Sequence, residues 1–460
     1  GRNSGRRLIV MKNLKSHPMY WLYNILLLIY WATLIPMLIY RLIREEGFYQ
    51  RIKQSIGFLP EELKDKISNR HAIWVHAASV GEVVAASPIV RELKKKYPDE
   101  MVVVSVVTAT GHRMAQRIIP EADGHIFFPF DLPVITERIV NIVNPKAIIL
   151  IETELWPNFL RLAWRKKIPV MMMNGRISGR SMRRYSLIKR FTTRMLFQIR
   201  KFCMQSKIDR ERIISMGAIP ERVVITGNTK YDQTYAEVSE EERARLRKEF
   251  RFEGKGPIIV AGSTHGGEEE IVVRTFGKIL EKYPDARLLL AVREITRAAS
   301  VRFMIKHQGY TVLRRSKMGT EEDDGKGAQI VILDTIGELG RLYSLADVVF
   351  VGGSFVKVGG HNILEPAAHG KPVLVGPYMF NFQEIFELLS ERGVCIMTPD
   401  ENSFEKTLMD LLGNPDKMKK MGEAALEVVH ENQGATERNI ASFEELVKEY
   451  GIKLREKHES

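Results

Sequence analysis

Short, continuous apolar runs alternate with segments of helical pattern along most of the chain, and this alternation restricts the fold more than any other feature. Runs of this kind are typical of strands buried on both faces of a parallel sheet, in which a helix connects each strand to the next. The runs form two series, one before residue 200 and one after residue 256: 72–75, 101–107, 147–151, 169–173, 257–261, 287–292, 329–333, 347–351 and 372–375. The sequence therefore predicts an α/β protein with two doubly wound, Rossmann-like domains facing a cleft.

The composition between the two series predicts where the domains divide. Residues 232–256 are charged and poor in core residues, which is typical of a linker. The segment before Met11 looks like an extension or tag. We expect an extension at 1–10, a membrane anchor helix at 11–43 and an N-terminal acceptor-binding domain at 44–231. A linker at 232–256, a C-terminal sugar-nucleotide domain at 257–425 and a helical tail at 426–460 are expected to follow.

Pro18 to Tyr40 contains no charged residue and is long enough to span a bilayer. Aromatic residues lie near both of its ends, as in the aromatic belts of membrane helices. A buried helix packed on the protein is the alternative, and Asn24 and Pro36 keep a half-inserted helix open. The sequence predicts a membrane anchor without deciding between spanning the membrane and lying in it.

Basic residues on the two sides of this helix predict its orientation. Lys12 and Lys15 precede it, whereas a larger number of basic residues follow it: Arg41, Arg44, Arg51 and Lys53. Because positive charge is enriched on the cytoplasmic side, we expect the body of the protein in the cytoplasm. Residues 41–70 are basic and are expected to form a juxtamembrane helix near anionic headgroups.

The net charge of +13 calls for an acidic partner, which leaves nucleic acid, an anionic membrane or a phosphorylated substrate. Aromatic platforms for nucleic-acid stacking are not evident, and the membrane helix argues against that class. Cys203 and Cys395 form no metal-binding pattern with histidines, so neither a disulfide framework nor a metal is expected. An oxidoreductase is disfavoured because no G-x-G-x-x-G precedes an acidic residue at the required spacing.

The stretch from Gly352 to Gly370 predicts a sugar-nucleotide site. Its glycine pairs, which include Gly360, allow close approach of the backbone to a ligand. Asn362 is expected to cap a helix whose free amides point at an anion, and Glu365 to bind a ribose. A purely structural turn between a strand and a helix is the alternative.

In the first domain, the predicted strands end in acidic residues. Glu82 begins a helix and could act as a general base, or it could simply balance the helix dipole. Glu152 and Glu154 would share one face if their strand continued, which is costly without a cation or a shared proton. A structural salt bridge is the alternative for this pair, and Arg176 follows the next strand.

Cations and hydroxyls at strand ends predict where a leaving phosphate binds. Lys230 and Arg293 could neutralise it, although a solvated surface role is the default for either residue. Ser263 and Thr264 precede His265 at a helix start, where hydroxyl and amide groups could form an anion cradle.

At these residues the sequence resembles the bacterial Kdo transferases, which join 3-deoxy-D-manno-octulosonic acid (Kdo) to lipid A precursors. The similarity covers nearly the whole chain and runs in order through nine motifs: His76–Glu82, Ile151–Asn158, Asn174–Ser178, Thr226–Lys230, Ser263–His265, Asp334–Leu339, Phe350–Phe355, Gly359–Pro366 and Gly376–Phe382. Two departures occur. Val292 and Glu294 flank Arg293 where the family often has Pro and His, and Gly266 replaces a common Glu.

The resemblance implies a GT-B architecture, a CMP-Kdo donor, a lipid A precursor (lipid IVA) acceptor, no metal or other cofactor, and a location at the bacterial inner membrane with a cytoplasmic body. It implies that Glu82 is the general base of an inverting transfer and that Glu152 and Lys230 stabilise the transition state. The residues implied in CMP binding are Arg293, Ile336, Gly337, Glu338, Asn362, Ile363, Leu364 and Glu365. Another GT-B transferase, a UDP-sugar epimerase and a basic membrane or nucleic-acid-binding protein remain alternatives.

Overall fold

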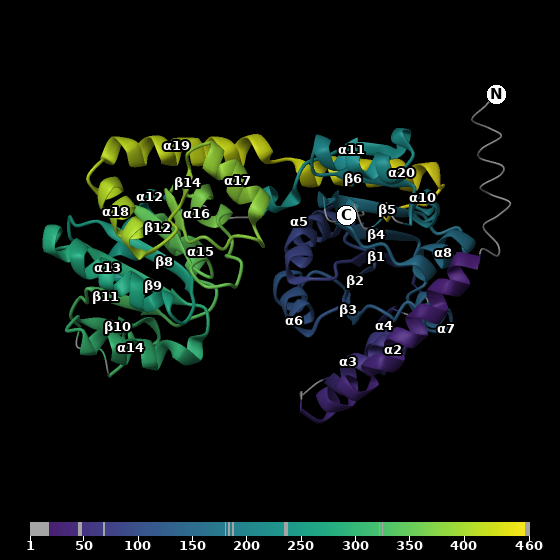
Figure 1. Ribbon diagram of the computed structural model, residues 1–460, viewed down its shortest axis with the longest axis horizontal. Coiled ribbons are helices and arrows are strands. Elements are labelled where there is room, and N and C mark those ends of the chain that lie inside the picture. The colour runs from purple at the N-terminus through teal and green to yellow at the C-terminus, as the bar shows by residue number, and fades with distance from the viewer. Residues whose placement is uncertain are drawn as a thin grey trace. The chain divides into compact units, whose positions relative to one another are not determined.

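The computed structural model divides the chain into two compact units, residues 1–233 with 432–460, and residues 234–431. It describes residues 18–44, 48–67, 70–179, 181–182, 185, 188–233, 238–321, 323 and 325–455 (Figure 1). The predicted extension at 1–10, Lys12 and Lys15 lie outside the described residues.

The first unit is built on a seven-stranded sheet whose neighbouring strands are all parallel. The strand order is β3-β2-β1-β4-β5-β6-β7. The bounds are β1 Ile73–His76, β2 Val102–Val106, β3 Gly124–Phe127, β4 Ala147–Ile151, β5 Val170–Gly175, β6 Lys201–Met204 and β7 Val223–Ile225. In this order β1 lies beside β4. The strands that follow β1 extend toward one edge of the sheet, and the strands that follow β4 extend toward the other.

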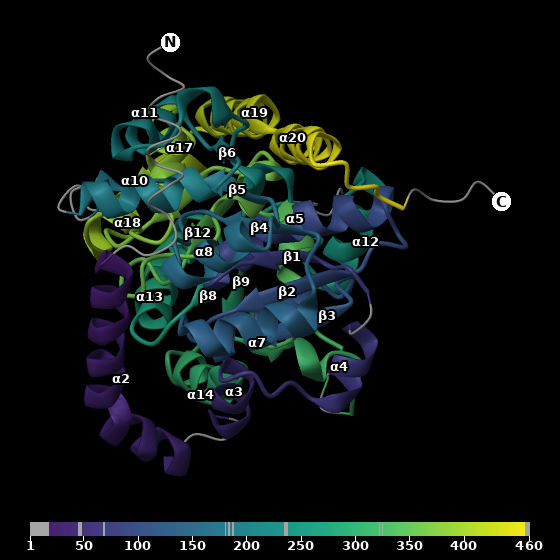
Figure 2. The ribbon, with the colours of Figure 1, turned by 90° about the vertical axis from the view of Figure 1, so that its right-hand side faces the viewer.

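Helices bury both faces of this sheet. One face packs on α5 (Val80–Lys96), α6 (Ala109–Ile118) and α20 (Ala435–Glu449). The other packs on α7 (Pro133–Val143), α8 (Pro157–Arg165), α10 (Lys189–Gln198) and α11 (Lys207–Met216), and Figure 2 shows α7 and α8 in front of the strands. The expected juxtamembrane helix is instead two short helices, α3 (Phe48–Ser55) and α4 (Glu61–Ile67), in the described part of that segment.

The second unit has a parallel seven-stranded sheet of order β10-β11-β9-β8-β12-β13-β14. Its strands are β8 Ile258–Thr264, β9 Arg287–Val292, β10 Val312–Arg314, β11 Ile330–Leu333, β12 Val348–Val351, β13 Val373–Val375 and β14 Cys395–Met397. Its longer helices are α12 Glu240–Glu249, α13 Glu268–Lys282, α14 Ala298–His307, α17 Gln383–Glu391, α18 Glu401–Leu412 and α19 Pro415–Asn432. The two parallel α/β units confirm the predicted fold class.

Strands that the sequence predicted are mainly those in the centre of each sheet. The strands without a prediction, β3, β6, β7, β10 and β14, lie at or next to a sheet edge. An edge strand has a neighbour on one side only, so its sequence carries a weaker apolar signal than that of a central strand. β10, for example, has no fully buried residue.

Two segments that were expected to lie outside the domain cores, the linker and the tail, contribute buried side chains to them. The stretch expected to be a linker contributes Leu246, Phe250 and Phe252, all buried, to the second unit. The expected tail is divided, because α19 stays with the second unit whereas α20 returns to the first. Ile440 and Phe443 of α20 lie in the core of the first unit. An amphipathic helix indicates that it packs on something but not on which domain, so composition could not place either segment.

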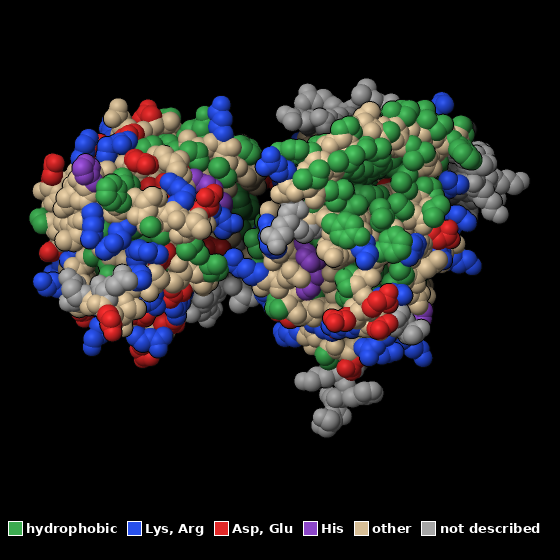
Figure 3. Space-filling view, turned by 90° about the horizontal axis from the view of Figure 1, so that it is seen from below, with side chains coloured by type: hydrophobic (Ala, Val, Ile, Leu, Met, Phe, Trp, Pro, Cys, Tyr) green, Lys and Arg blue, Asp and Glu red, His purple; other side chains and the backbone are tan. Residues whose placement is uncertain are grey.

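Helix α2 (Pro18–Arg44) is long and apolar enough to cross a membrane, and it packs on the first unit along one side only. Tyr20 is buried, and its hydroxyl accepts a hydrogen bond from Gln198 at 3.0 Å. Tyr23 donates to Asp131 at 2.9 Å, and Asn24 accepts from Asn158 at 2.7 Å. The outward side chains of α2 form a ridge of hydrophobic surface (Figure 3), with Trp21, Leu22, Ile25, Leu26, Ile29 and Tyr40 all more than half exposed.

Phe443→Ala should lower the free energy of unfolding of the first unit by about 3–5 kcal/mol, because the ring is fully buried against the sheet. Phe303→Ala is the matched control, since Phe303 is 75% exposed. Hydrogen exchange of β1 and β4 across a urea series measures the effect. A loss below about 1 kcal/mol would show that α20 is not part of this core.

Candidate active site

The candidate residues of each unit lie at the carboxyl end of its sheet, where the strand order reverses. In the first unit this point lies between β1 and β4, and in the second between β8 and β12. Doubly wound sheets bind ligands beyond the strand ends at such points, because loops that diverge there leave a crevice. Glu82 follows β1 and Glu152 follows β4, while Ser263 lies near the end of β8 (Ile258–Thr264) and Gly352 follows β12.

Glu82 lies in the first turn of α5, where Ser79 is the N-cap. Its carboxylate accepts hydrogen bonds from the Ala78 amide at 2.7 Å and the Ser79 hydroxyl at 3.0 Å. The Glu82 amide in turn donates to Ser79 Oγ at 3.4 Å, so Ser79 caps the helix. Glu82 thus lies in the first turn, the position that the dipole-balancing alternative requires. These bonds hold the carboxylate at a fixed place above the strand end.

The surroundings of Glu82 favour its protonated form. The pKa of Glu82 is raised to about 8, mainly by burial and then by the nearby charges of Glu154 and Glu152, while the bonds from Ala78 and Ser79 oppose the shift. A buried carboxylate beside two like charges resists ionisation. An acid with this pKa is poised to exchange a proton near neutral pH.

Glu152 is held in a left-handed backbone conformation, with φ +58°. The strand stops at Ile151, so the condition under which Glu152 and Glu154 would share one face is not met. Glu152 turns toward Lys230, whose Nζ lies 3.0 Å from Glu152 Oε1. Thr153 donates to the carbonyl of Arg176, which brings the loop after β5 beside this turn.

Glu154 pairs with no lysine or arginine among the described residues and is held by two rings. Trp156 Nε1 donates to Glu154 Oε2 at 2.9 Å, and His76 Nε2 lies 3.6 Å from the same oxygen. His76 is fully buried, and its Nε2 makes no hydrogen bond to a described residue. On the other side of the ring, His76 Nδ1 lies 2.9 Å from Ser105 Oγ and 3.3 Å from the Ser105 carbonyl oxygen, and Trp74 also donates to Ser105 Oγ at 2.7 Å. These contacts hold the His76 ring in place beside Glu154.

Lys230 is placed by a short 3-10 helix, η2 (Thr229–Asp232), that is fastened at both ends. The Thr229 amide donates to Asn174 Oδ1 at 2.9 Å, and its hydroxyl donates to the Ala85 carbonyl of α5 at 2.8 Å. Asp232 accepts from the amides of Gly434 and Thr436 at the start of α20. The returning helix thus helps to position the candidate cation. The sequence offered no signal for this role of Asp232.

In the second unit a carboxylate already occupies part of the predicted anion cradle. Glu268, fully buried, accepts from the amides of His265 and Gly353 at 2.9 and 2.7 Å. It also accepts from the amides of Ser354 and Phe355 at 3.0 and 2.9 Å. These four amides are therefore occupied, and one of them, that of His265, belongs to the predicted cradle. Anion binding by the rest of that cradle, which includes Ser263 and Thr264, stays a prediction. Glu268 fastens the β8 and β12 loops together, a function that sequence cannot distinguish from that of Glu269 or Glu270 in the same turn.

The glycines after β12 permit close packing, although the expected helix is short. A side chain at Gly352 would meet Ser263 O at 2.5 Å, and Gly360 has φ +79°. Asn362 Oδ1 accepts from the Leu364 amide at 3.0 Å, and Asn362 Nδ2 donates to Glu365 at 3.2 Å. The helix that follows, α16 (Leu364–Ala368), has only five residues. Asn362 therefore caps a turn, whereas the N-cap of α16 is Ile363 and not Asn362 as predicted. Anion binding at this turn stays a prediction.

The remaining predicted CMP-binding residues differ in how firmly they are held. Glu338 is held by Arg315 at 3.0 Å, Arg341 at 2.9 Å and Thr335, and the bond from Arg315 is the main cause that lowers the pKa of Glu338 to about 2. Ile336 is 67% exposed, and Gly337 has φ +92°. Arg293 is exposed, and among the described residues no hydrogen bond or ion pair uses its guanidinium.

Backbone strain marks the same strand ends. Six described non-glycine residues have positive φ. Asn144, Lys167 and Arg251 follow helices, where this conformation is common. The other three, Glu152, Asn174 and Ser263, lie at or directly after the candidate strand ends. Such strain costs energy and concentrates at functional sites, so it supports the placement of the site.

Metal binding was not expected, and no group of three His, Cys, Asp or Glu side chains among the described residues could hold an ion. Metal independence stays a prediction.

Comparison with known proteins agrees with the predicted family. Residues 50–233 match the family model of 3-deoxy-D-manno-octulosonic-acid transferase (kdotransferase), and residues 315–428 match that of group 1 glycosyl transferases. The chain is 36% identical over 399 residues to the 3-deoxy-D-manno-octulosonic acid transferase of Haemophilus influenzae, covering 86% of this chain and 91% of that protein. It is 30% identical to the transferase of the same name from Bordetella pertussis, over 81% of this chain and 87% of the relative.

Solved structures share the fold at low identity. The UDP-GlcNAc 2-epimerase of Neisseria meningitidis matches with a TM-score of 0.54 and 12% identity, over 81% of this chain and all of that chain. A glycosyltransferase from Rickettsia africae matches with a TM-score of 0.53 and 15% identity, over 83% of this chain and 99% of that one. These likenesses support the GT-B fold, and the sequence relatives identify the enzyme. The chain is a glycosyltransferase that belongs to the 3-deoxy-D-manno-octulosonic acid transferase family.

Proposed function

We propose that this enzyme transfers Kdo from CMP-Kdo to a hydroxyl of a lipid A precursor, releasing CMP with inversion at the anomeric carbon. The observation that carries the proposal is the buried Glu82, with its pKa near 8, in a chain of this family. As the acceptor oxygen bonds to the anomeric carbon of Kdo, Glu82 takes the hydroxyl proton. The bond from that carbon to the phosphate oxygen breaks, and CMP leaves with both bonding electrons.

Residues around Glu82 are assigned supporting roles. Lys230 and Glu152 form an ion pair at 3.0 Å. This pair holds Lys230 in the neighbourhood of Glu82. We assign this pair to transition-state stabilisation, with Arg176 on the adjacent loop as an additional contact. A preorganised cation costs no rearrangement when charge develops during the reaction.

Donor binding is assigned to the second unit. Arg293 is exposed and its guanidinium makes no ion pair within the described residues, which suits a cation that meets the CMP phosphate. The residues assigned to the nucleotide are Ile336, Gly337, Glu338, Asn362, Ile363, Leu364 and Glu365, with Ser263, Thr264 and Gly360 as additional contacts. One phosphate carries less charge than a diphosphate, so side-chain cations can replace a metal.

We also propose that α2 attaches the enzyme to the bacterial inner membrane, with both units in the cytoplasm. The hydrogen bonds of Tyr20, Tyr23 and Asn24 hold one side of α2 to the first unit. A helix that crossed the bilayer would have to give up polar contacts of this kind. The contacts favour a helix that lies along the protein and presents its hydrophobic ridge to lipid.

Glu82→Gln should lower transfer by at least about 100-fold, because an amide cannot accept the acceptor proton. Mass spectrometry of lipid A precursor incubated with CMP-Kdo measures the added Kdo, and calorimetry should show CMP affinity within about twofold of wild type, since the nucleotide residues are unchanged. Glu137→Gln, on the exposed surface of α7, is the control. Parent-like turnover by Glu82→Gln would remove Glu82 from the mechanism, and binding of UDP without CMP would favour an epimerase-like ligand.

Glu154→Gln should move the rising limb of the pH–rate profile to lower pH by roughly one unit. Within the part of the chain that the structure describes, Glu152 pairs with Lys230 whereas Glu154 pairs with no lysine or arginine, so Glu154 is the less compensated negative charge. Removing that charge favours ionised Glu82 and lowers the pKa of Glu82. Initial rates between pH 5.5 and 9.5 test this effect, again with Glu137→Gln as control. An unmoved limb would show that Glu154 does not act on the base.

Replacing Ile25 and Ile29 together by Ser should weaken binding to vesicles of anionic phospholipid about tenfold, because two half-exposed apolar side chains would no longer enter lipid. Ile208 and Ile225, replaced in the same way, are matched controls because they are 58% and 48% exposed on other elements of the first unit. Vesicle flotation measures the bound fraction. Equal flotation of both double variants would place the attachment elsewhere.

A further inference from the structure

Two histidines from different loops of the second unit meet at its switch point. His265 follows β8, and His361 follows the glycine loop after β12. Their Nε2 atoms lie 2.9 Å apart, and the two rings are parallel to within 1°. Because a hydrogen bond between two ring nitrogens needs one donor and one acceptor, a single proton lies between these atoms.

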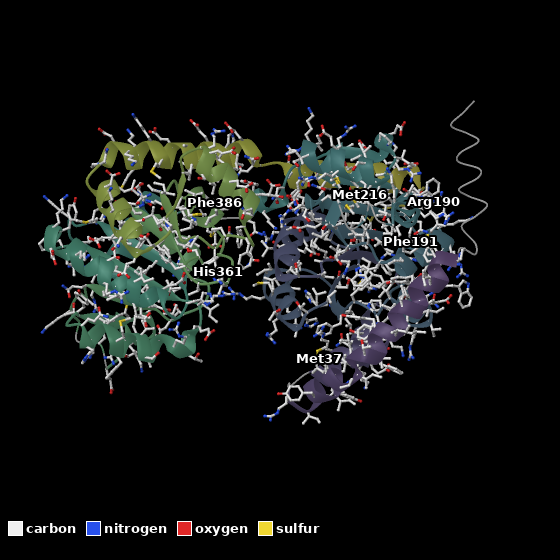
Figure 4. The ribbon with its side chains drawn as sticks, viewed as in Figure 1. Met37, Arg190, Phe191, Met216, His361 and Phe386 are labelled. Carbon is white, nitrogen blue, oxygen red and sulfur yellow. The ribbon has the colours of Figure 1, made fainter. Side chains whose placement is uncertain are left out.

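The protein is built to hold this pair together. Glu268 fixes the amide of His265 and that of Gly353, so the two loops cannot separate without losing buried hydrogen bonds. A Cβ at Gly353 would lie 3.0 Å from His361 Cδ2, and Gly353 has φ +67°. The glycine therefore makes room for the imidazole. Figure 4 labels His361 on this loop.

The charges around the pair oppose a second proton while no anion is present. The pKa of His361 is lowered to about 4, mainly by burial and then by the charges of Arg293 and His265. Other charged groups nearby are already engaged. Glu268 binds four loop amides, and Arg297 pairs with Glu269 at 2.8 Å. Lys357, on the loop of His361, lies 5.9 Å from the ring of Tyr378.

We infer that His265 and His361, together with Arg293, form an anion site that takes up one proton when the donor phosphate binds. This inference rests on the proposed CMP-Kdo donor and adds the histidines to its binding site. An anion beside Arg293 offsets the positive charge that keeps the pair from protonation. One imidazole then becomes imidazolium, the Nε2 contact remains, and the Nδ1 nitrogens of both rings become donors.

The added proton has a use in the reaction. The donor phosphate is a diester with one negative charge, and departing CMP carries close to two. A cationic histidine pair is more valuable to the departing group than to the bound donor, so it stabilises the transition state more than the ground state. The proton comes from solvent and returns to it when CMP leaves, so no further reactant is needed.

Calorimetry of CMP binding to the full chain at pH 7.5, in two buffers of different ionisation enthalpy, measures the protons taken up. Wild type should take up about one proton more than His361→Gln or His265→Gln, because one ring nitrogen of the intact pair can accept a further proton. Each variant should also bind CMP about tenfold more weakly. His307→Gln, an exposed histidine on α14, is the control, and CMP contributes its own protonation equally to every titration. Cytidine should cause no uptake.

The outcomes separate this inference from the proposed function. CMP binding with the same proton number in wild type and both histidine variants would overturn the inference and leave the proposed donor standing. Absence of CMP binding to wild type would overturn both. Two variants are used because replacing either histidine should abolish the additional proton uptake. One variant that folds well is therefore sufficient for the test.

Discussion

Repulsion among Glu82, Glu152 and Glu154 at the end of the first sheet is the constraint on which the candidate site depends. Three ionised carboxylates this close would destabilise the fold, and the protein relieves the repulsion in three different ways. Lys230 pairs with Glu152, while Glu154 is held by the Trp156 and His76 rings. For Glu82, burial and the two neighbouring charges raise the pKa to about 8, so its protonated and ionised forms exchange near neutral pH. The ionised form is the base that the transfer requires.

In both units the candidate residues lie at the carboxyl end of the parallel sheet, but the groups gathered there are acidic in the first unit and basic in the second. In the first unit the loops after β1 and β4 gather carboxylates. In the second the loops after β8 and β12 gather imidazoles beside Arg293, and Glu268 is sealed beneath them. The strained residues Glu152 and Ser263 occupy equivalent places, each at or directly after the end of a strand at the switch point. This arrangement suits a reaction in which an alcohol loses a proton and a phosphate gains charge.

Much of this could be predicted from sequence, and the failures have physical causes. Buried central strands are continuous apolar runs, so they and the residues at their ends were found. The partner of each side chain at the same edge could not be assigned from sequence. The left-handed backbone at Glu152, for example, turns its carboxylate toward Lys230 and away from Glu154. Glu268 looks like any acidic residue at a helix start, yet it occupies an amide of the predicted anion cradle. Helix α20 was undetectable as part of the first core, because amphipathic pattern does not identify the partner surface.

The most direct test is the ionisation of Glu82 itself. Carbon-13 NMR of protein labelled at glutamate side-chain carboxyls, with Glu82→Gln used to assign the resonance, gives its titration curve. We expect a midpoint near pH 8 in the free enzyme. A midpoint near the ordinary glutamate value of about 4.3 would contradict the account, because Glu82 would then be fully ionised beside Glu154 at neutral pH.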